Sequence, residues 1–470
     1  MTPRPSRWLC WVVPAAALLA CSQTRLASRV APLGDALAQS DAAGRPATLV
    51  LASIAGLTPD RYLEGAMLAL ASLAAVGVAA EQVAPIAPAA VYPAHASLVT
   101  GVAPAGHGVM ADHLLGERGV RRAQPRHASQ LRAPTLWQRV GESGGTVAAF
   151  DWPTTTGAEI AWLLPDVAPE RKGESWTALV ARDASAGVAA RVHGAPAEVA
   201  EPGAARDALL VDLACASFAE APRLVLLRLR GAEGPLAAHG PRSAQAGSAF
   251  ARVDDEIARL VRCAEQAGGL AETAFVVVGD RALLAAHSAL RPNVWLREEH
   301  LITAQGRWSA IARSNGGSAF VYASDAKAAL RARQRLEAAA RETGAFRVVS
   351  AEEMIERQAD PDAWFGLAAE PGFVFEDSFA GAPLAASTRQ GAGGYLGARP
   401  EAVTGFVAFG RGVRRGIVVP RMSQLDVAPT LAALLGVQLE PAGGRALVGL
   451  LRLRPGVEAV APAPAGVPGG

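Results

Sequence analysis

The sequence predicts an α/β domain with a mostly parallel central sheet and helices on both of its faces. The chain has 470 residues and a hydrophobic content of 51%, enough to bury one large core. Several continuous apolar runs are typical of strands buried on both faces; they lie at 48–57, 146–150, 223–230, 274–280 and 406–410. Helical patterns lie between them. Because strands that alternate with helices form parallel sheets, we expect a site at the carboxyl ends of the strands.

The net charge argues against one class of partner. A formal charge of +2 gives no sign of the strongly basic surface that nucleic-acid-binding domains carry. We therefore expect no nucleic acid among the partners.

The N-terminus has the layout of a bacterial lipoprotein signal. Arg4 and Arg7 precede an apolar run over 8–20 that is shorter than a membrane span. Leu18-Leu19-Ala20-Cys21 then resembles a lipobox, with a small residue before the cysteine. This predicts a signal peptide over 1–20 and lipidation of Cys21, and Ser22 after the cysteine favours the outer membrane, facing the periplasm or the cell surface. The alternative is an ordinary signal peptide in which Cys21 has no role.

Three further segments lack the pattern of a folded element. Residues 21–45 are small and polar, which predicts a tether between lipid and domain. Residues 185–206 are rich in Ala, Gly and Pro, and we expect a loose surface excursion there. The composition of 455–470 predicts a disordered tail. The folded domain is then expected over 46–454.

Two cysteines remain once Cys10 is removed with the signal and Cys21 is lipidated. Cys215 and Cys263 each lie in an apolar helical pattern. We expect two buried free thiols, with a disulfide as the alternative.

The segment 91–109 carries the most specific motif of the chain, VYPAHASLVTGVAPAGHGV. It resembles the active-site segment of the type I phosphodiesterase/nucleotide pyrophosphatase family of the alkaline phosphatase superfamily, T-F-P-x-H-x-S/T-L-V-T-G-x-x-P-x-x-H-G. Segments 133–153, 291–302 and 423–437 are similar to further family segments in the same order. The resemblance implies an alkaline phosphatase-like core with an inserted cap lobe, here about 285–390.

The family's catalytic alcohol is missing from the position that the motif gives to it. The leading Thr of the motif is the family's nucleophile, and Val91 stands in its place. An isopropyl group offers no lone pair to phosphorus or to a metal ion.

The carboxylates of the metal site are only partly retained. The family uses two zinc ions roughly 4 Å apart, held by carboxylates and imidazoles. Its S-I-D-G motif has become 53–56, which places Ala55 at the Asp position. Its D-x-x-G-H-x-x-G-P motif aligns with 233–241 and places Glu233 at the leading Asp. Asp280 is the one unchanged ligand position.

All three histidines of the family's metal site are replaced. Ala237 takes the place of the His in the second motif, and Gly393 takes the place of the His in G-x-H-G-Y. Arg281 follows Asp280 where the family has His. A guanidinium stays protonated and has no free lone pair for a cation. The resemblance thus implies a site that has lost its metal, in which Arg281 pairs with Asp280 or Glu233, or binds an anion.

The remaining polar residues of these motifs have simpler explanations. His95, His107, Ser97 and Thr100 are expected to pack or cap around the helix that the motif starts. His239, two residues beyond Ala237, is an alternative, displaced metal ligand.

Asp112, His113 and Asp151 could face the cleft, but their spacing matches no recognised metal set.

We therefore expect a non-catalytic, lipid-anchored member of this family in a bacterial envelope. It would have no cofactor and would bind an anionic small molecule or another envelope protein. The alternative is an active phosphodiesterase or phosphatase with rearranged ligands and two zinc ions.

Overall fold

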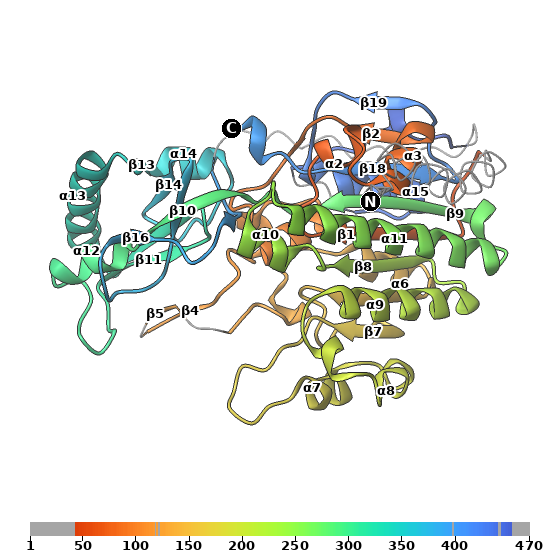
Figure 1. The fold of residues 1–470 in the computed structure, drawn as a ribbon, viewed down its shortest axis with the longest axis horizontal. Helices are drawn as coiled ribbons and strands as arrows, with labels where there is room; N and C mark the ends of the chain where they lie inside the picture. Colours follow the sequence, from red (N-terminus) through yellow and green to blue (C-terminus); the bar gives the residue numbers. More distant parts are fainter. Residues whose placement is uncertain (1–42, 118, 121–122, 397–398, 440–442, 454–470) are drawn as a thin grey trace, which may run out of the picture.

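The computed structural model describes residues 43–117, 119–120, 123–396, 399–439 and 443–453. The expected signal peptide, Cys21, most of the tether and the tail lie outside these residues. In Figure 1 a large sheet-and-helix body adjoins a smaller lobe at the left.

The main sheet has eight strands in the order β19-β2-β18-β9-β1-β8-β6-β7, which run from top to bottom in Figure 1. Their bounds are β1 (Thr48–Ile54), β2 (Val78–Ala80), β6 (Val147–Trp152), β7 (Trp162–Pro165), β8 (Leu224–Leu229), β9 (Thr273–Gly279), β18 (Phe406–Gly410) and β19 (Ile417–Val419). β18 runs antiparallel to both of its neighbours, and the other pairs are parallel. The carboxyl ends of β1, β8 and β9 therefore meet at one edge of the sheet.

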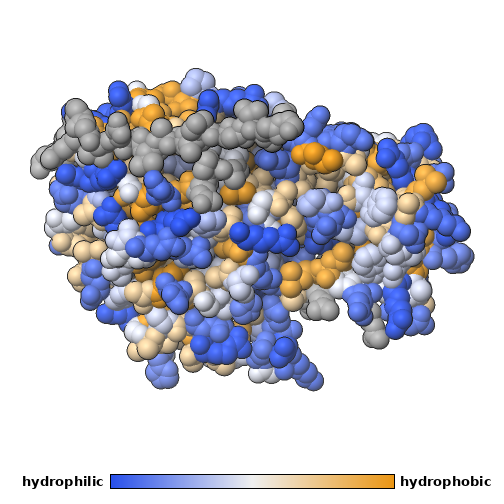
Figure 2. Space-filling model, turned by 180° about the vertical axis from the view of Figure 1, so that it is seen from behind, coloured by the Kyte–Doolittle hydropathy of each residue, from blue (hydrophilic) through white to orange (hydrophobic). Residues whose placement is uncertain are grey.

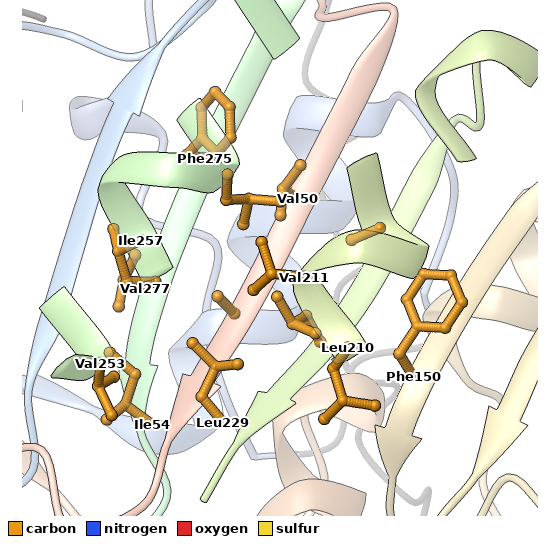
Figure 3. Close-up of a cluster of buried hydrophobic side chains, with 14 of the residues drawn as sticks. Val50, Ile54, Phe150, Leu210, Val211, Leu229, Val253, Ile257, Phe275 and Val277 are labelled. Atoms are coloured by element: carbon orange, nitrogen blue, oxygen red, sulfur yellow. The ribbon is translucent and has the colours of Figure 1, made fainter. Parts of the chain in front are cut away.

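The sheet separates two hydrophobic layers because successive side chains of a strand point to opposite faces. In β1, Val50 and Ile54 belong to one layer, whereas Leu49 and Leu51 belong to the other. Figure 3 shows the first layer, in which Val50 lies beside Val211. This pattern explains why the strands are apolar without alternation.

Helices cover both faces of the main sheet. The first layer is completed by α2 (Asp60–Leu63), α3 (Leu68–Val76), α7 (Trp176–Asp183), α8 (Ala186–Val192), α9 (Ala204–Ser217) and α11 (Ala244–Gln266). The second layer is completed by α4 (Val91–Thr100), α6 (Leu136–Glu142) and α15 (Val427–Leu435). Two further helices, α5 (Pro104–His107) and α10 (Glu233–His239), follow α4 and β8.

The smaller lobe has a core of its own, whose residues run from Ala286 to Leu396. One of its sheets contains β10 (Leu284–Leu290), β15 (Gly372–Phe375), β16 (Leu384–Ala386) and β17 (Gly391–Ala392). The other is antiparallel and contains β11 (Ala310–Ser314), β12 (Ser318–Ala323), β13 (Phe346–Val349) and β14 (Phe365–Ala369). Its helices are α12 (Pro292–Glu298), α13 (Ala326–Thr343) and α14 (Ala351–Glu356). Two small pairs, β3 (Val83–Ala84) with β20 (Met422–Ser423) and β4 (Leu115–Gly116) with β5 (Gly119–Val120), complete the described strands.

Two expectations about local structure are wrong. Residues 185–206 are not a loose excursion: α8 lies within them, and its Val188 and Val192 are buried in the first layer. Cys215 and Cys263 are not free thiols but form a disulfide with a Cα–Cα distance of 5.4 Å. The contact between α9 and α11 brings these cysteines together, and the pattern of each helix alone does not reveal which residues face each other.

Within the described residues, none of the helices is both long enough and apolar enough to cross a bilayer.

Candidate functional site

The motif positions converge at the carboxyl edge of the main sheet. Ala55 follows β1, Glu233 starts the helix after β8, and Asp280 follows β9. Gly393 follows the short strand β17 of the smaller lobe. Segments far apart in the chain thus form one site, where open parallel sheets place their ligands.

Arg281 joins the two remaining carboxylates of the site. Its Nη2 donates to Oε1 of Glu233 at 2.7 Å, and its Nη1 donates to Asp280 Oδ2. Asp280 is fully buried, and its Oδ1 also accepts the backbone N–H groups of Arg281 at 2.7 Å and of Gly56 at 3.2 Å. The side chain of Arg281 is only 9% exposed. The guanidinium therefore lies between the carboxylates as their counter-ion.

Gly393 leaves the space that this arginine occupies. A β-carbon added to Gly393 would lie 2.8 Å from Cδ of Arg281 and 3.0 Å from its Nε. Both distances are far shorter than ordinary carbon contacts. The glycine at the last histidine position is thus needed for the observed position of the arginine.

Further arginines neutralise Glu233. Nε of Arg230 donates to Glu233 Oε2 at 2.9 Å, and Nη2 of Arg228 lies 3.7 Å from the same oxygen. Burial alone would raise the pKa of Glu233, but Arg230, Arg281 and Arg228 together hold it well below its ordinary value. Glu233 is therefore ionised and has several cationic partners.

The ion pairs continue beneath the site. Arg228 reaches Asp166 at 3.3 Å and Arg230 reaches it at 3.6 Å. Burial would raise the pKa of Asp166, but Arg230 and Arg228 lower it. Farther in, Nη1 of Arg206 donates to Asp151 Oδ1 at 2.9 Å. Asp151 thus belongs to a buried ion-pair network and not to the lining of the cleft.

Val91 occupies the nucleophile position at the start of α4 and is only 7% exposed. His95, one turn later, is fully buried. Burial and the nearby Arg228 lower the pKa of His95 to about 3, so its ring is neutral. Its Nδ1–H donates to the Val91 carbonyl at 2.8 Å, and its Nε2 accepts the Ser53 hydroxyl at 2.9 Å. The Nδ1 bond lies within α4, and the Nε2 bond ties α4 to β1, so both ring nitrogens have structural partners.

The hydroxyls and the second histidine of the motif are also structural. Nδ1 of His107 accepts the Val109 N–H at 3.1 Å, so its Nε2 donates to Ser97 Oγ at 3.1 Å. Ser97 donates to the Val102 carbonyl, and Thr100 donates to the Ala96 carbonyl, each at 2.8 Å. The structure therefore places these groups in the packing of α4, as the sequence predicted.

A cleft of about 400 Å³ between the two lobes is lined in part by Arg281 and Glu233. Asp112 and His113 line it from the main body, and Asn315 and Asp377 line it from the smaller lobe. Burial raises the pKa of Asp377 to about 6, although the Ser314 N–H bonds to its Oδ1 at 2.6 Å. The cleft thus retains polar groups from both lobes.

The residues of this edge do not fit a pair of zinc ions. A cation would have to displace the Arg281 guanidinium from the carboxylates of Asp280 and Glu233. His239 is exposed at the end of α10 and does not line the cleft. In the part of the chain that the structure describes, no group of three or more His, Cys, Asp or Glu is arranged to hold a metal ion. A zinc ion would therefore be repelled by the Arg281 guanidinium, which already pairs with the carboxylates of the site.

Sequence reasoning missed the arginines below the site and the polar wall of the smaller lobe. Arg228 and Arg230 interrupt the end of an otherwise apolar strand run, a signal that could have identified them. Asn315 lies in the turn between β11 and β12, in a segment without a motif, and no local signal marks it.

Comparison with known proteins agrees with this architecture. The family model for type I phosphodiesterase / nucleotide pyrophosphatase matches residues 49–395. The murine ectonucleotide pyrophosphatase / phosphodiesterase 5 is similar in structure, with a TM-score of 0.63 at 18% identity over 86% of this chain and 100% of that chain. The human protein of the same name gives a TM-score of 0.63 at 17% identity over 86% of this chain and 99% of that chain. No curated protein sequence matches the chain significantly. Because the family match spans well over half of the 470 residues, the chain belongs to the type I phosphodiesterase/nucleotide pyrophosphatase family.

Proposed function

We propose that this chain is a non-catalytic member of its family, a pseudoenzyme that binds a ligand in its cleft without hydrolysing it. One observation carries the proposal: Arg281 donates to both Asp280 and Glu233, in the space that Gly393 leaves open. The fixed cation takes the electrostatic role that metal ions have in a metal-dependent hydrolase.

The electrostatics of the site support this assignment. Two carboxylates that bind no cation repel each other and raise each other's pKa. Burial disfavours the charged form of Arg281, but Asp280, Glu233 and Asp112 outweigh that effect and raise its pKa above the ordinary value. The guanidinium therefore stays charged at any physiological pH, and a zinc ion would meet its repulsion. In addition, Val91 supplies no alcohol for attack at the position where the family has its nucleophile.

A phosphate bound directly at Arg281 fits this arrangement poorly. The guanidinium already donates to two carboxylates, and Asp112 lies close enough to influence it. The negative charges of these carboxylates would repel an approaching anion. The cleft above Arg281 offers the better place for a ligand.

A protein partner is the other role that a non-catalytic member could have. Figure 2 shows hydrophobic residues on one face as small patches scattered among hydrophilic ones. Large exposed apolar patches are what usually marks a protein interface. The binding role proposed here rests on the cleft, which gives a defined place for a ligand.

Turnover assays test the assignment. Protein that starts at Ser22 should hydrolyse no nitrophenyl phosphodiester, phosphomonoester or sulfate above a buffer blank, with or without added zinc. A zinc-dependent rate that Asp280→Ala or His239→Ala abolishes would instead establish an active hydrolase with rearranged ligands.

We also propose that the chain is exported and anchored to the envelope through lipid on Cys21. The lipobox-like 18–21 segment supports this, and so does the Cys215–Cys263 disulfide, because such bonds persist mainly in oxidising compartments. Labelled fatty acid should enter the wild-type protein in a bacterial host and should not enter Cys21→Ser. Equal labelling of both would refute lipid attachment.

A further inference from the structure

We propose that a basic strip on the main body, formed by residues 411–421 and 443–453, docks on an anionic lipid bilayer. This inference rests on the proposed anchoring to the envelope and names the surface that would face the membrane.

Positive charge is concentrated in the two segments of the basic strip. Residues 411–421 contain four arginines, residues 443–453 contain two, and neither segment contains Asp or Glu. The whole chain, by contrast, is nearly balanced, with a formal charge of +2. The basic strip therefore carries a local charge that the composition of the chain does not reveal.

The two segments lie side by side in the fold. The first contains β19, the outermost strand of the main sheet, at the top of Figure 1. At one end of the strip, the Arg414 N–H donates to the Leu450 carbonyl at 2.9 Å. At the other end, Arg421 and Arg445 line one open depression. The arginines of both segments thus belong to one surface.

These arginines are available to an anion. Arg414, Arg421 and Arg445 are exposed. In the described part of the chain, the guanidinium groups of Arg421 and Arg445 have no hydrogen bond or ion pair, and that of Arg414 bonds to the Leu451 carbonyl at 3.0 Å. Asp426 also lines the depression, but it is only 5% exposed and both of its carboxylate oxygens accept backbone N–H groups. Phosphate groups could therefore bind here without breaking an internal ion pair.

Glu81 and Glu272 border the basic strip but do not neutralise it. Glu272 is paired with Arg411 at 2.7 Å. Glu81 is exposed, and its N–H donates to the Val419 carbonyl at 2.9 Å. These two carboxylates face six arginines, so the described surface remains positive.

The N-terminal segment joins the domain at the basic strip. The Gly44 N–H donates to the Arg452 carbonyl at 2.9 Å, and Nε of Arg411 donates to the Arg45 carbonyl at 3.0 Å. A lipid on Cys21 would be connected through residues 22–43 to this surface and would hold it near the bilayer. Basic groups beside a membrane anchor are attracted to anionic headgroups, and one lipid chain combined with a basic patch anchors better than the chain alone. A membrane is therefore favoured over a soluble polyanion as the partner.

The basic strip also presents an apolar side chain to solvent. Val448, in the short helix η7 (Val448–Leu450), is 48% exposed. The next residue, Gly449, faces open space, because no atom lies within 4 Å of an added β-carbon. An apolar residue flanked by basic ones is typical of surfaces that lie in the headgroup layer. The strip shares no described residue with the cleft lining, so a membrane and a cleft ligand could be bound together.

Vesicle binding tests the inference with protein that starts at Ser22 and therefore has no lipid. We expect it to co-sediment with phosphatidylcholine vesicles that contain phosphatidylglycerol, and not with pure phosphatidylcholine vesicles. High salt should release it, because salt screens the attraction. No binding to the anionic vesicles, or equal binding to both kinds, would overturn the inference. Retention on immobilised heparin without vesicle binding would assign the strip to a soluble polyanion and would equally overturn it.

Charge reversal locates the surface that binds. Arg421→Glu combined with Arg445→Glu should weaken binding to the anionic vesicles at least about tenfold. The matched control is Arg252→Glu combined with Arg262→Glu, at two exposed arginines of α11, which covers the first layer of the main sheet. This control should weaken binding much less, and melting curves should show that both variants are folded. Equal losses in the two variants would show that binding follows net charge and not the basic strip.

A fluorescent label reports the contact without changing any charge. Val448→Cys labelled with nitrobenzoxadiazole should shift its emission to the blue on anionic vesicles, because the label enters a less polar layer. Leu330→Cys, at a residue of α13 that is 57% exposed in the smaller lobe, should show no shift. Cys215 and Cys263 are joined in the disulfide and do not take the label. No shift at position 448, or equal shifts at both positions, would contradict the proposed orientation.

Failure of this inference is distinguishable from failure of the anchoring proposal. If fatty acid does not enter the protein but the soluble form binds vesicles through the basic strip, only lipid attachment is disproved. If fatty acid enters and the soluble form ignores anionic vesicles, only the docking surface is disproved. Neither result depends on whether the cleft hydrolyses a substrate.

Discussion

Arg281 and Gly393 are complementary in shape. The arginine side chain passes so close to the glycine that an added β-carbon would lie 2.8 Å from its Cδ. These residues stand at two of the family's three histidine positions. The two replacements therefore depend on each other, because the larger residue needs the smaller one.

This dependence predicts the behaviour of Gly393→Ala. Overpacking of this kind typically destabilises a protein by about 1–3 kcal/mol. The backbone of Gly393 is not among those with positive φ, so alanine brings no backbone strain. We expect a clear loss of unfolding free energy in the wild-type background and a much smaller loss in the Arg281→Ala background.

Denaturant unfolding of the four proteins in this double-mutant cycle gives the coupling energy. Equal losses in both backgrounds would show that Gly393 does not serve to accommodate the arginine. Gly187→Ala, at a glycine in α8 with no atom within 4 Å of the added β-carbon, is the matched control.

Removing Arg281 itself should leave a buried charge without its cation. Asp280 is fully buried and would lose its ion pair, whereas Glu233 would keep Arg230 at 2.9 Å. We expect Arg281→Ala to lower the unfolding free energy by about 3 kcal/mol, near the low end for a broken buried pair. Arg139→Ala, which breaks a surface pair with Glu142, should change it by less than about 1 kcal/mol. Similar small effects of both substitutions would mean that Arg281 stabilises nothing.

Asp377 should make stability depend on pH. Burial raises its folded-state pKa to about 6, above the ordinary value of about 4 for an unfolded aspartate. Between these values the folded state retains a proton that the unfolded state has lost. The contribution of Asp377 to the free energy of unfolding therefore falls as pH rises from about 4 to 6.

Asp377→Asn should remove this dependence. The variant would keep an oxygen for the Ser314 N–H and would be more stable than the wild type by about 1–2 kcal/mol above pH 6, with no advantage near pH 4. Unfolding measured across this pH range checks the expectation. A constant difference between the two proteins would contradict it.

The disulfide should contribute strongly to stability. It closes a loop with a sequence separation of 48, for which the chain-entropy model gives about 4 kcal/mol. Cys215→Ala combined with Cys263→Ala should lower the melting temperature by several degrees, and reduction should lower it for the wild type only. Identical melting curves with and without reductant would show that the bond does not form.

The fold was accessible from the sequence because its signals are local. The run 274–278 is apolar throughout, and burial on both faces of the sheet produces that pattern. The replaced metal-ligand positions could be identified from the sequence because each motif position can be compared with the family pattern one at a time.

Contacts between residues far apart in the sequence could not be predicted from such local signals. The disulfide depends on how α9 packs on α11. The network from Arg206 to Arg228 depends on which strands are neighbours in the sheet. Asn315 lines the cleft together with Asp112 only because the smaller lobe lies beside the main sheet edge. In each case the tertiary arrangement decides which residues meet.

The zinc content of the purified protein tests the central claim most directly. Protein that starts at Ser22 and is dialysed after incubation with zinc should retain far less than one equivalent by elemental analysis. Arg281→His should not restore binding, because Ala55, Ala237 and Gly393 still lack ligating atoms. Two equivalents of zinc retained by the wild type would contradict the proposal that Arg281 has replaced the metal ions.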